Sequence, residues 1–559
     1  MTTTVDSAQS LPALMLGLAV ADPGRGLFTY WRDGAWRSMR RGDFAQAVAD
    51  AAAGLRALGV MPGDRVLLVS ENRPEFLVAD TAIMAIGAVT VPTYVSNTVA
   101  DHAHILRDSG ARAAIASTPA LAARLREAGE LDLLLCLDGP AEGAALAWSA
   151  IAVPGADAAM LMAEVEQIPE GRLACLIYTS GTGGAPKGVM LPHRALLSNC
   201  RAVHTLLRQM QLPRAARYLS FLPLSHSYEH TVGGFLMPSF GLETVFSRGA
   251  DKLLADFAEH RPQLVTAVPR LFEVLKERIE AQLAKDKPWK QGLFRHAVAL
   301  GLRRLDGPPL SWLERAQDAV LDRLVRAKVR ARFGGELAAM VSGGARLDPD
   351  LSGFFIALGV PIIQGYGQTE AGPVISCNVP WDNDRRSVGR PMPGVEARIA
   401  EDGELLVRGP LMMDGYWNNP DATAATIRDG WLHTGDVAEL RGGRLFITDR
   451  KRDFLKLKGG DMVAPAKIEA LLAAEPAIAQ AVVGGEGLAG VVALIIAAEG
   501  RAGEVEAAVK RVNARLSSIE RIRRHAALDE PFSVENGLLT PTMKVRRRLV
   551  LERYRALLT

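Results

Sequence analysis

The stretch Tyr178–His193 reads YTSGTGGAPKGVMLPH, and it concentrates four glycines, several hydroxyl side chains and one lysine in a single segment. A glycine-rich loop loses much conformational entropy when it becomes ordered, so it usually wraps around something that offsets this loss. Backbone N–H groups, hydroxyls and a lysine are suitable donors to phosphate oxygens. The segment therefore predicts a clamp for a nucleoside triphosphate, with a glycine-rich hairpin tip and a solvated lysine as the alternative.

This segment differs from the G-x-x-x-x-G-K-[ST] loop of P-loop proteins. Lys187 follows a proline, and Gly188 stands where that loop carries a serine or threonine. The flanking stretches LACLIY and GVMLPH predict two short strands, the second ended by Pro192, rather than a strand and a helix. We therefore expect a strand–loop–strand clamp, which disfavours a phosphotransferase of the P-loop kind.

The composition is that of an ordinary globular protein with room for several domains. The chain has 559 residues, of which 48% are hydrophobic and 23% charged, and its formal net charge is only +3. This small charge implies no strongly charged partner, and we expect no nucleic acid to bind. The four cysteines are scattered without metal or redox spacing, and the first twenty residues lack the basic start of a signal peptide. We therefore expect a protein of the reducing cytoplasm.

Helical and strand patterns alternate along most of the chain. Residues 43–58 predict a helix with Asp43 as its N-cap, followed by a strand at 64–70, a helix at 74–88 and a strand at 89–94. This βαβ order indicates a parallel sheet covered by helices, and the same alternation returns after the glycine-rich loop. Because roughly 350 residues exceed one such core, we expect two α/β sheets.

The final third of the chain changes character. Residues 386–409 carry alternating apolar positions and turn signals, which predict antiparallel strands in a small β-barrel or sheet. A dense polar run, TDRKRDFLKLK at 448–458, suggests a domain boundary. We therefore expect a large domain at 1–449, with two α/β subdomains and the barrel, followed by a small mobile α+β domain at 450–559.

The segment 276–332 is far more basic than the rest of the chain. It holds 14 Lys or Arg residues against 7 Asp or Glu residues, and Trp289, Phe294 and Trp312 lie among these charges. Solvated helix faces account for this composition. The alternative is a surface that rests on anionic lipid, which predicts peripheral contact with the inner face of a membrane.

Four further stretches carry polar residues far from the first loop. FLPLSHSYEH contains His226, QGYGQTEAG contains Glu370, DGWLHTGD contains Asp436 and ENGLLTPTMKVRRR contains Lys544. Each is a weak signal alone, because a structural histidine, an ordinary turn or a basic tail would also explain it. Together and in this order they resemble the adenylate-forming superfamily of acyl-CoA synthetases, luciferases and peptide-synthetase adenylation domains, from about residue 26 to 555.

Within that superfamily the chain most resembles long-chain fatty acid–CoA ligases. The stretches that carry this resemblance are VPTYVSNT (91–98), VPRLFE (268–273), GGDMVAPAKIE (459–469) and NGLLTPTMK (536–544). The helical insertion that follows VPRLFE is also similar to that branch.

The resemblance implies a set of residues that bind ATP and its Mg²⁺. The loop would hold the β- and γ-phosphates through Thr179, Ser180, Gly181, Thr182, Gly183, Gly184 and Lys187. An adenine slot would comprise Gly343, Gly344, Ala345, Gln364, Gly365, Tyr366 and Gly367, with Tyr366 stacked on the base. Thr369 would contact the α-phosphate and Glu370 would hold the metal. Asp436 and Arg450 would bind the ribose hydroxyls.

The same resemblance implies the residues that act on the acyl group. The implied catalytic residues are Lys544, Glu370, His226, Lys187 and Thr182. Lys544 would reach from the small domain to the reacting carboxylate and phosphate, and Arg452 would form the hinge. Lys458, Gly459 and Gly460 would approach the CoA arm.

One residue departs from the family pattern. The family loop reads TSGTTG-x-PKG, whereas this chain has Gly183 at the position of the second threonine. The lost hydroxyl is one neutral hydrogen bond, on the order of 1 kcal/mol, so we expect a weaker contact with ATP rather than loss of function.

The resemblance implies that ATP activates a long-chain fatty acid as an acyl-adenylate, which CoA then converts to acyl-CoA. No carrier-protein segment follows Lys544, which argues against a peptide-synthetase module. The alternatives are a fatty acyl-AMP ligase that passes the acyl group to a carrier protein, and a non-catalytic lipid- or membrane-binding protein that keeps the fold.

Overall fold

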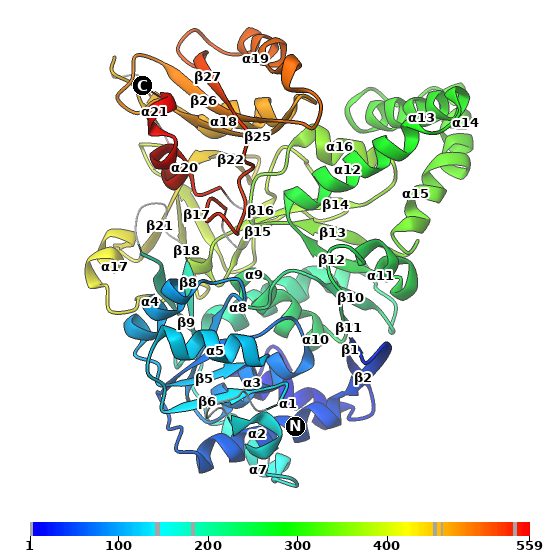
Figure 1. The fold of residues 1–559 in the computed structure, drawn as a ribbon. Coiled ribbons are helices and arrows are strands. Elements are labelled where there is room, and N and C mark those ends of the chain that lie inside the picture. Colours follow the sequence, from blue (N-terminus) through cyan, green and yellow to red (C-terminus); the bar gives the residue numbers. More distant parts are fainter. Residues whose placement is uncertain are drawn as a thin grey trace.

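The computed structural model describes residues 4–139, 146–151, 153–179, 185–450, 455–459, 462–539 and 545–558, without the side chains of 449, 450 and 462. Figure 1 shows a large body built from the first four fifths of the chain and a separate lobe formed by the last hundred residues. The described chain contains two large sheets and three small ones.

The first large sheet is built mostly from the amino-terminal residues, and five of its pairings are parallel. Its eight strands lie in the order β19 (Gly415–Tyr416), β9 (Lys187–Pro192), β8 (Leu173–Thr179), β4 (Val89–Thr93), β3 (Arg65–Val69), β5 (Ala113–Ala116), β6 (Leu133–Cys136) and β7 (Leu146–Ala147). The antiparallel pair of β8 and β9 is the hairpin that the sequence predicts.

The second large sheet has a parallel centre and antiparallel edges. Its nine strands lie in the order β16 (Arg390–Pro391), β15 (Val374–Cys377), β14 (Ile362–Gly367), β13 (Ala339–Ser342), β12 (Leu264–Ala267), β10 (Arg217–Ser220), β11 (Glu243–Phe246), β1 (Gly26–Arg32) and β2 (Ala35–Arg40). The expectation of two α/β sheets is therefore confirmed.

Helices cover both sheets (Figure 1). The helices of the large body outside the basic segment are α1 (Leu11–Ala21), α2 (Arg41–Ala57), α3 (Pro74–Ala85), α4 (Val99–Ser109), α5 (Pro119–Ala128), α6 (Trp148–Ile151), α7 (Ala158–Val165), α8 (His193–Leu207), η1 (Arg208–Met210), α9 (Ser227–Thr231), η2 (Val232–Leu236), α10 (Met237–Phe240), α11 (Leu253–His260), α16 (Pro349–Ala357), η4 (Thr369–Ala371) and α17 (Pro420–Thr426).

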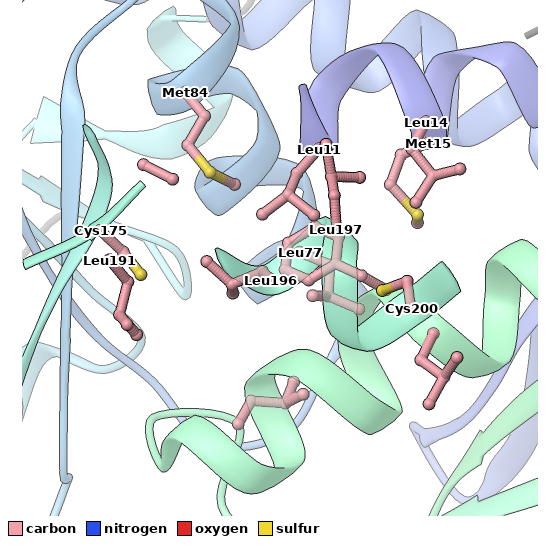
Figure 2. Packing of buried hydrophobic residues seen from close by; sticks show 14 of the residues in the cluster. Leu11, Leu14, Met15, Leu77, Met84, Cys175, Leu191, Leu196, Leu197 and Cys200 are labelled. Carbon is pink, nitrogen blue, oxygen red and sulfur yellow. The ribbon is translucent and has the colours of Figure 1, made fainter. Parts of the chain in front are cut away.

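A single apolar cluster joins the two sheets through α1, α3 and α8. Figure 2 shows Leu11 and Met15 of α1 beside Leu197 and Cys200 of α8, all of them buried. Ser10 caps the start of helix α1. Its hydroxyl accepts the Ala13 N–H and donates to the carbonyl of Val165, 155 residues away. Helix α1 is thus a part of the apolar core that joins the two sheets.

The predicted N-cap of α2 is wrong. The helix begins two residues earlier than expected, at Arg41, and Asp43 lies at its third position. The Asp43 carboxylate accepts the backbone N–H of Arg40 at 3.1 Å. The carboxylate therefore still satisfies a backbone donor at the helix start, but from inside the helix.

The strands that follow the large sheets form an antiparallel sheet. They are β17 (Glu396–Ile399), β18 (Glu404–Arg408), β21 (Trp431–Arg441), β20 (Ile427–Arg428) and β22 (Arg444–Arg450). Of the two alternatives that the sequence left open, barrel or sheet, the strand pairing describes a five-stranded sheet. It carries Asp436 on β21, opposite Arg450 of β22 in the backbone register.

The last lobe is a small α+β unit (Figure 1). Its elements are β23 (Leu455–Lys456), β24 (Met462–Val463), α18 (Pro465–Ala473), β25 (Ile478–Gly484), β26 (Val491–Ala497), η5 (Ala502–Glu504), α19 (Val505–Ala514), β27 (Ile522–Leu528), α20 (Arg547–Arg553) and α21 (Arg555–Leu558). Its two apolar clusters draw only on residues after 454, which is typical of an independent domain.

The basic segment consists of helices joined by short connections and projects from one side of the large body (Figure 1). It contains α12 (Pro269–Ala284), α13 (Pro288–Asp306), α14 (Trp312–Leu321), η3 (Asp322–Arg326) and α15 (Ala327–Arg332). The fully buried Arg326 ties these helices together, because its guanidinium donates to carbonyls of Ala297 and Ala357 and pairs with Asp318 at 2.7 Å. Within the described ranges, no helix is long and apolar enough to cross a membrane.

Candidate active site

The base of the β8–β9 hairpin places Thr179 opposite Lys187 in the backbone register. The Lys187 ammonium lies 4.8 Å from the centre of the Tyr416 ring, so a cation–π contact holds the lysine at the loop entrance. The tip of the predicted phosphate loop lies outside the described residues, which here leave out Ser180, Gly181, Thr182, Gly183 and Gly184.

The hairpin is held from behind by α4. His104 Nε2 lies 2.8 Å from the carbonyl oxygen of Pro186, and the Tyr178 hydroxyl donates to the Asp108 carboxylate at 2.6 Å. Burial and the neighbouring Asp108 charge raise the pKa of Tyr178, so its hydroxyl stays protonated and keeps donating. These contacts anchor both ends of the loop.

Glu370 lies close to the same lysine. It is on η4, immediately after β14, and its carboxylate accepts the Tyr416 hydroxyl at 2.8 Å. Tyr416 therefore contacts both Lys187 on β9 of the first large sheet and Glu370 on η4, which follows β14 of the second. A cation and a carboxylate joined by one aromatic residue suit the binding of a metal-bound polyphosphate.

The predicted adenine residues follow the parallel strands β13 and β14. Ligands of open α/β sheets bind at the carboxyl ends of such strands. Gly343 allows the Tyr228 ring to approach, since a Cβ there would lie 2.8 Å from a ring carbon, and Gly344 has a φ of +77°. Gly367 tolerates no side chain, since its Cβ would lie 1.8 Å from the Pro373 oxygen. Ala345 is exposed and Gly365 is half-buried.

The Gln364 side chain forms hydrogen bonds within the protein. Its amide donates to the Arg385 carbonyl at 2.8 Å and accepts the Leu347 N–H at 3.3 Å. The side chain therefore fixes the loop after Gly343–Ala345. A contribution of Gln364 to an adenine slot would come from its backbone.

Tyr366 and Asp436 meet although 70 residues separate them. The Tyr366 hydroxyl donates to the Asp436 carboxylate at 2.5 Å, and Asp436 is only 3% exposed. This bond joins the second large sheet to the five-stranded sheet. The Arg450 side chain, the second predicted ribose ligand, lies outside the described residues.

The five-residue helix α9 connects most parts of the site. His226 caps its start, with Nδ1 accepting the Tyr228 N–H at 3.2 Å, and its ring lies 6.5 Å from that of Tyr94. The Ser227 and Thr369 hydroxyls are hydrogen-bonded at 2.9 Å. The Tyr228 hydroxyl donates to the Val341 carbonyl at 3.1 Å. Helix α9 thus fixes His226 relative to the predicted α-phosphate contact, Thr369.

Glu229 of the same helix is fully buried in a hydroxyl network. Its carboxylate accepts hydrogen bonds from Tyr218, Ser220 and Thr266, at 2.8, 2.6 and 2.6 Å, and these residues lie on the adjacent strands β10 and β12. Burial raises the pKa of Glu229 to about 7, although the three hydroxyls favour the charged form. Glu229 therefore anchors α9 to the sheet.

The glycines after Glu229 are used for close packing. A Cβ on Gly233 would lie 2.2 Å from the Glu229 carboxylate, and one on Gly234 would lie 3.1 Å from Leu77. Neighbouring side chains therefore fill the space beside both glycines.

Glu229→Gln should remove a pH dependence of stability. The pKa of the Glu229 carboxyl group is raised from 4.5 to about 7. Its contribution to the free energy of unfolding is therefore complete below pH 4.5 and is lost as the pH rises to about 7. The loss is about 3 kcal/mol. Thermal unfolding from pH 4.5 to 8 should show the wild type losing stability relative to the glutamine variant. Ser220→Ala, which keeps the carboxyl group, should retain the loss of stability with rising pH; parallel curves for wild type and Glu229→Gln would refute this account.

The small domain contributes Lys458 and Gly459, which lie exposed in a turn after β23. The Lys458 N–H donates to the Leu488 carbonyl at 2.8 Å, which keeps the turn within its own domain. Arg452, Gly460 and Lys544 lie outside the described residues. Their roles, like those of the other site residues, stay predictions.

The side chains of the site suit a metal that arrives with its substrate. In the part of the chain that the structure describes, no three His, Cys, Asp or Glu side chains form a group that could hold a metal ion. Mg²⁺ commonly binds through one or two carboxylates together with substrate phosphates. A single carboxylate, Glu370, therefore fits an ion that ATP brings with it.

The sequence reasoning missed Tyr416 and Ser227. Tyr416 lies in DGYWNNP, where an aromatic pair precedes Asn419, the cap of α17, and this pattern could have marked a constrained segment. Ser227 directly follows His226, but nothing in the sequence indicates its partner Thr369. Both contacts are formed between distant segments.

The matched family models together extend over most of the chain. Residues 19–417 match the model of the AMP-binding enzyme family, and residues 452–559 match the model of the AMP-binding enzyme C-terminal domain.

The chain is also similar to curated and solved proteins. It is 36% identical to the long-chain-fatty-acid–CoA ligase FadD15 of Mycobacterium tuberculosis, over 99% of this chain and 96% of that one. It is 31% identical to the peroxisomal long chain acyl-CoA synthetase 6 of Arabidopsis thaliana, over 92% and 80%. The structure of O-succinylbenzoate coenzyme A synthetase from Bacillus subtilis, in complex with ATP and magnesium ion, superposes with a TM-score of 0.72 at 22% identity, over 96% and 98%.

Proposed function

Because the chain belongs to the AMP-binding enzyme family, we propose that it is a long-chain fatty acid–CoA ligase that forms acyl-CoA, AMP and pyrophosphate. The observation that carries this proposal is the 36% identity to a long-chain-fatty-acid–CoA ligase over nearly the whole of both chains. Membership of the adenylate-forming superfamily, inferred above from ordered motifs, is thereby confirmed. ATP, Mg²⁺ and CoA are the proposed co-substrates and ion.

The first step is attack of the fatty carboxylate on the α-phosphorus of ATP. The carboxylate–phosphorus bond forms, the bond to the bridging oxygen breaks, and pyrophosphate leaves with that electron pair. Two anions must meet, so the protein contributes mainly positioning and positive charge. Lys187 would hold the departing phosphates, Asp436 the ribose, and Lys544 the meeting point; Mg²⁺ at Glu370 would neutralise phosphate charge.

The second step is attack of the CoA thiol on the acyl carbonyl. The thioester bond forms and AMP leaves, while the thiol proton passes to solvent or to AMP. Lys544 would block this approach, so the small domain would rotate about Arg452 and bring Lys458, Gly459 and Gly460 to the site. One site would then serve two half-reactions in two closed states.

The protein should prefer long acyl chains and free CoA. With saturating ATP and CoA, we expect the kcat/KM for sixteen-carbon acids to exceed that for acetate or benzoate by at least ~10²-fold, because each buried CH₂ contributes about 0.8 kcal/mol. Acyl-CoA and AMP are quantified by chromatography. Preference for short or aromatic acids would contradict the substrate class. Pyrophosphate release without acylation of free CoA would favour the carrier-protein ligase.

We also propose that the enzyme works at a membrane surface rather than only in bulk solution. Long-chain acids partition into bilayers, so an enzyme that uses them gains substrate concentration there. The basic helices α12–α15 are the segment whose charge supports this.

A further inference from the structure

Helix α14 exposes an apolar face. Trp312, Leu313, Val320 and Leu324 are 76%, 54%, 55% and 46% exposed. At 100° per residue these four side chains, with the exposed Ala316 between them, fall on one side of α14 and η3. The face extends over roughly 18 Å of helix, from position 312 to 324.

The opposite side of the same helix is packed and therefore rigid. Leu321 and Val325 belong to the apolar cluster of the second large sheet. Ser311 caps the helix start, since its hydroxyl accepts the Glu314 N–H while its own N–H donates to the Glu314 carboxylate. The apolar face is thus held outward by the fold and lies along the protein surface, as Figure 1 shows for α14 at the outer edge.

Much of the positive charge of the segment that carries this face, residues 276–332, has no carboxylate partner. Ion pairs occupy Glu280, Asp286, Asp306, Glu314, Asp318 and Asp322, so six of the seven acidic residues of the segment already have a basic partner. Among the described contacts, eight exposed basic residues pair with no carboxylate: Arg278, Lys285, Lys287, Arg295, Arg315, Arg323, Lys328 and Arg332. Arg323 directly precedes Leu324 of the face, and Lys328 follows Leu324 by four residues.

An exposed tryptophan and aliphatic side chains edged by unpaired cations match the chemistry of an anionic bilayer surface. Apolar side chains enter the acyl boundary, while the cations meet lipid phosphates. A second copy of this chain would bring an equally basic segment to the face, and like charges would oppose that contact. The charge pattern therefore favours lipid over self-association.

We propose that the α14 face, defined as Trp312, Leu313, Ala316, Val320 and Leu324, docks on an anionic lipid bilayer, with Arg323 and Lys328 at its phosphates. The proposal names the lipid and the residues for the membrane contact proposed above, and it therefore rests on that proposed function. The helix lies in the plane of the interface, and the rest of the large body stays outside the bilayer.

Vesicle sedimentation tests this with the full-length protein and no substrates. Vesicles of phosphatidylcholine with phosphatidylglycerol should bind the wild type more tightly than pure phosphatidylcholine, and binding should fall as salt rises. The Trp312→Ser/Leu313→Ser variant should partition roughly tenfold less at low salt. Arg323→Glu/Lys328→Glu should also bind less and should lose much of the salt dependence.

Three controls keep this test independent of folding and of catalysis. Trp381→Ser removes a half-exposed tryptophan outside the segment and should bind vesicles like the wild type. Both α14 variants should keep the wild-type melting temperature and the wild-type activity on detergent-dispersed acid. Quenching of tryptophan emission by brominated lipid should be smaller in Trp312→Phe than in the wild type.

Several results would overturn the proposal. These are equal binding of wild type to neutral and anionic vesicles, no binding to either, or unchanged binding by both α14 variants. A dimer that dissociates in Trp312→Ser/Leu313→Ser would assign the face to a second copy instead. Because vesicle binding is measured without turnover, its failure leaves the proposed ligase activity standing, and failure of the activity leaves the docking result standing.

Discussion

Lys544→Ala is expected to slow acyl-adenylate formation by roughly 10²–10³-fold, the range found when one preorganised charge or donor at a transition state is removed. Lys544 lies in LTPTMK, at the place in the small domain where the superfamily carries its adenylation lysine. Its ammonium would offset the repulsion between the fatty carboxylate and the α-phosphate. Single-turnover pyrophosphate release with fatty acid and ATP measures this step alone.

The same variant should retain the second half-reaction. Given preformed acyl-adenylate and CoA, Lys544→Ala should make acyl-CoA at nearly the wild-type rate, because the small domain would have rotated the lysine away. Lys510→Ala is a matched control, since Lys510 is an exposed lysine of the same domain that pairs with Glu506 at 3.8 Å. Equal losses in both half-reactions would show that Lys544 acts structurally or that no rotation occurs.

Asp436→Ala is expected to lower kcat/KM for ATP by roughly 10²-fold. The carboxylate would accept the ribose hydroxyls, and hydrogen bonds to a charged group are worth about 1.5–3 kcal/mol. The substitution also removes the acceptor of the Tyr366 hydroxyl at 2.5 Å, which frees the residue proposed to stack on adenine. Initial rates at varied ATP concentration measure the effect.

Tyr366→Phe separates the two contributions of Asp436. Phenylalanine keeps the ring for stacking but loses the bond to Asp436, so kcat/KM for ATP should fall by about tenfold or less. KM for the fatty acid should change little in either variant. If the kcat/KM of Asp436→Ala for ATP lies within about threefold of the wild-type value, Asp436 is excluded as a ribose ligand.

The features that depend on local pattern could be predicted from the sequence. LACLIY and GVMLPH are apolar runs bounded by turn residues, and they form β8 and β9. The βαβ order of residues 64–94 likewise gives β3, α3 and β4. Such elements are specified by periodicity, because burial of one face selects a helix or a strand.

Features that depend on distant contacts could not be predicted. Asp43 satisfies the start of α2 from its third position, which the sequence cannot distinguish from an N-cap by composition. The glycines 233 and 234 are required by Glu229 and Leu77, which only the folded chain brings beside them. Tyr416 contacts both Glu370 on η4 and Lys187 on β9, and no local sequence pattern indicates these contacts.

The resemblance to a family carried more of the site than the patterns did. Tyr366 and Asp436 were implied for adenine and ribose on motif order alone, and the structure brings them within one hydrogen bond. The side chain of Gln364, implied for the same slot, instead holds the loop through Arg385 and Leu347. Motif order thus locates a residue at the site without telling whether its side chain or its backbone acts.

The central claim is that a fatty carboxylate attacks the α-phosphorus of ATP to form an acyl-adenylate. It is tested most directly by following carboxylate oxygen from palmitate labelled with heavy oxygen, in a reaction with ATP and CoA. The account predicts that one labelled oxygen per turnover appears in AMP, none in pyrophosphate, and that palmitoyl-CoA forms in equal amount. Label in inorganic phosphate together with ADP, or acyl-CoA formed without labelled AMP, would contradict it.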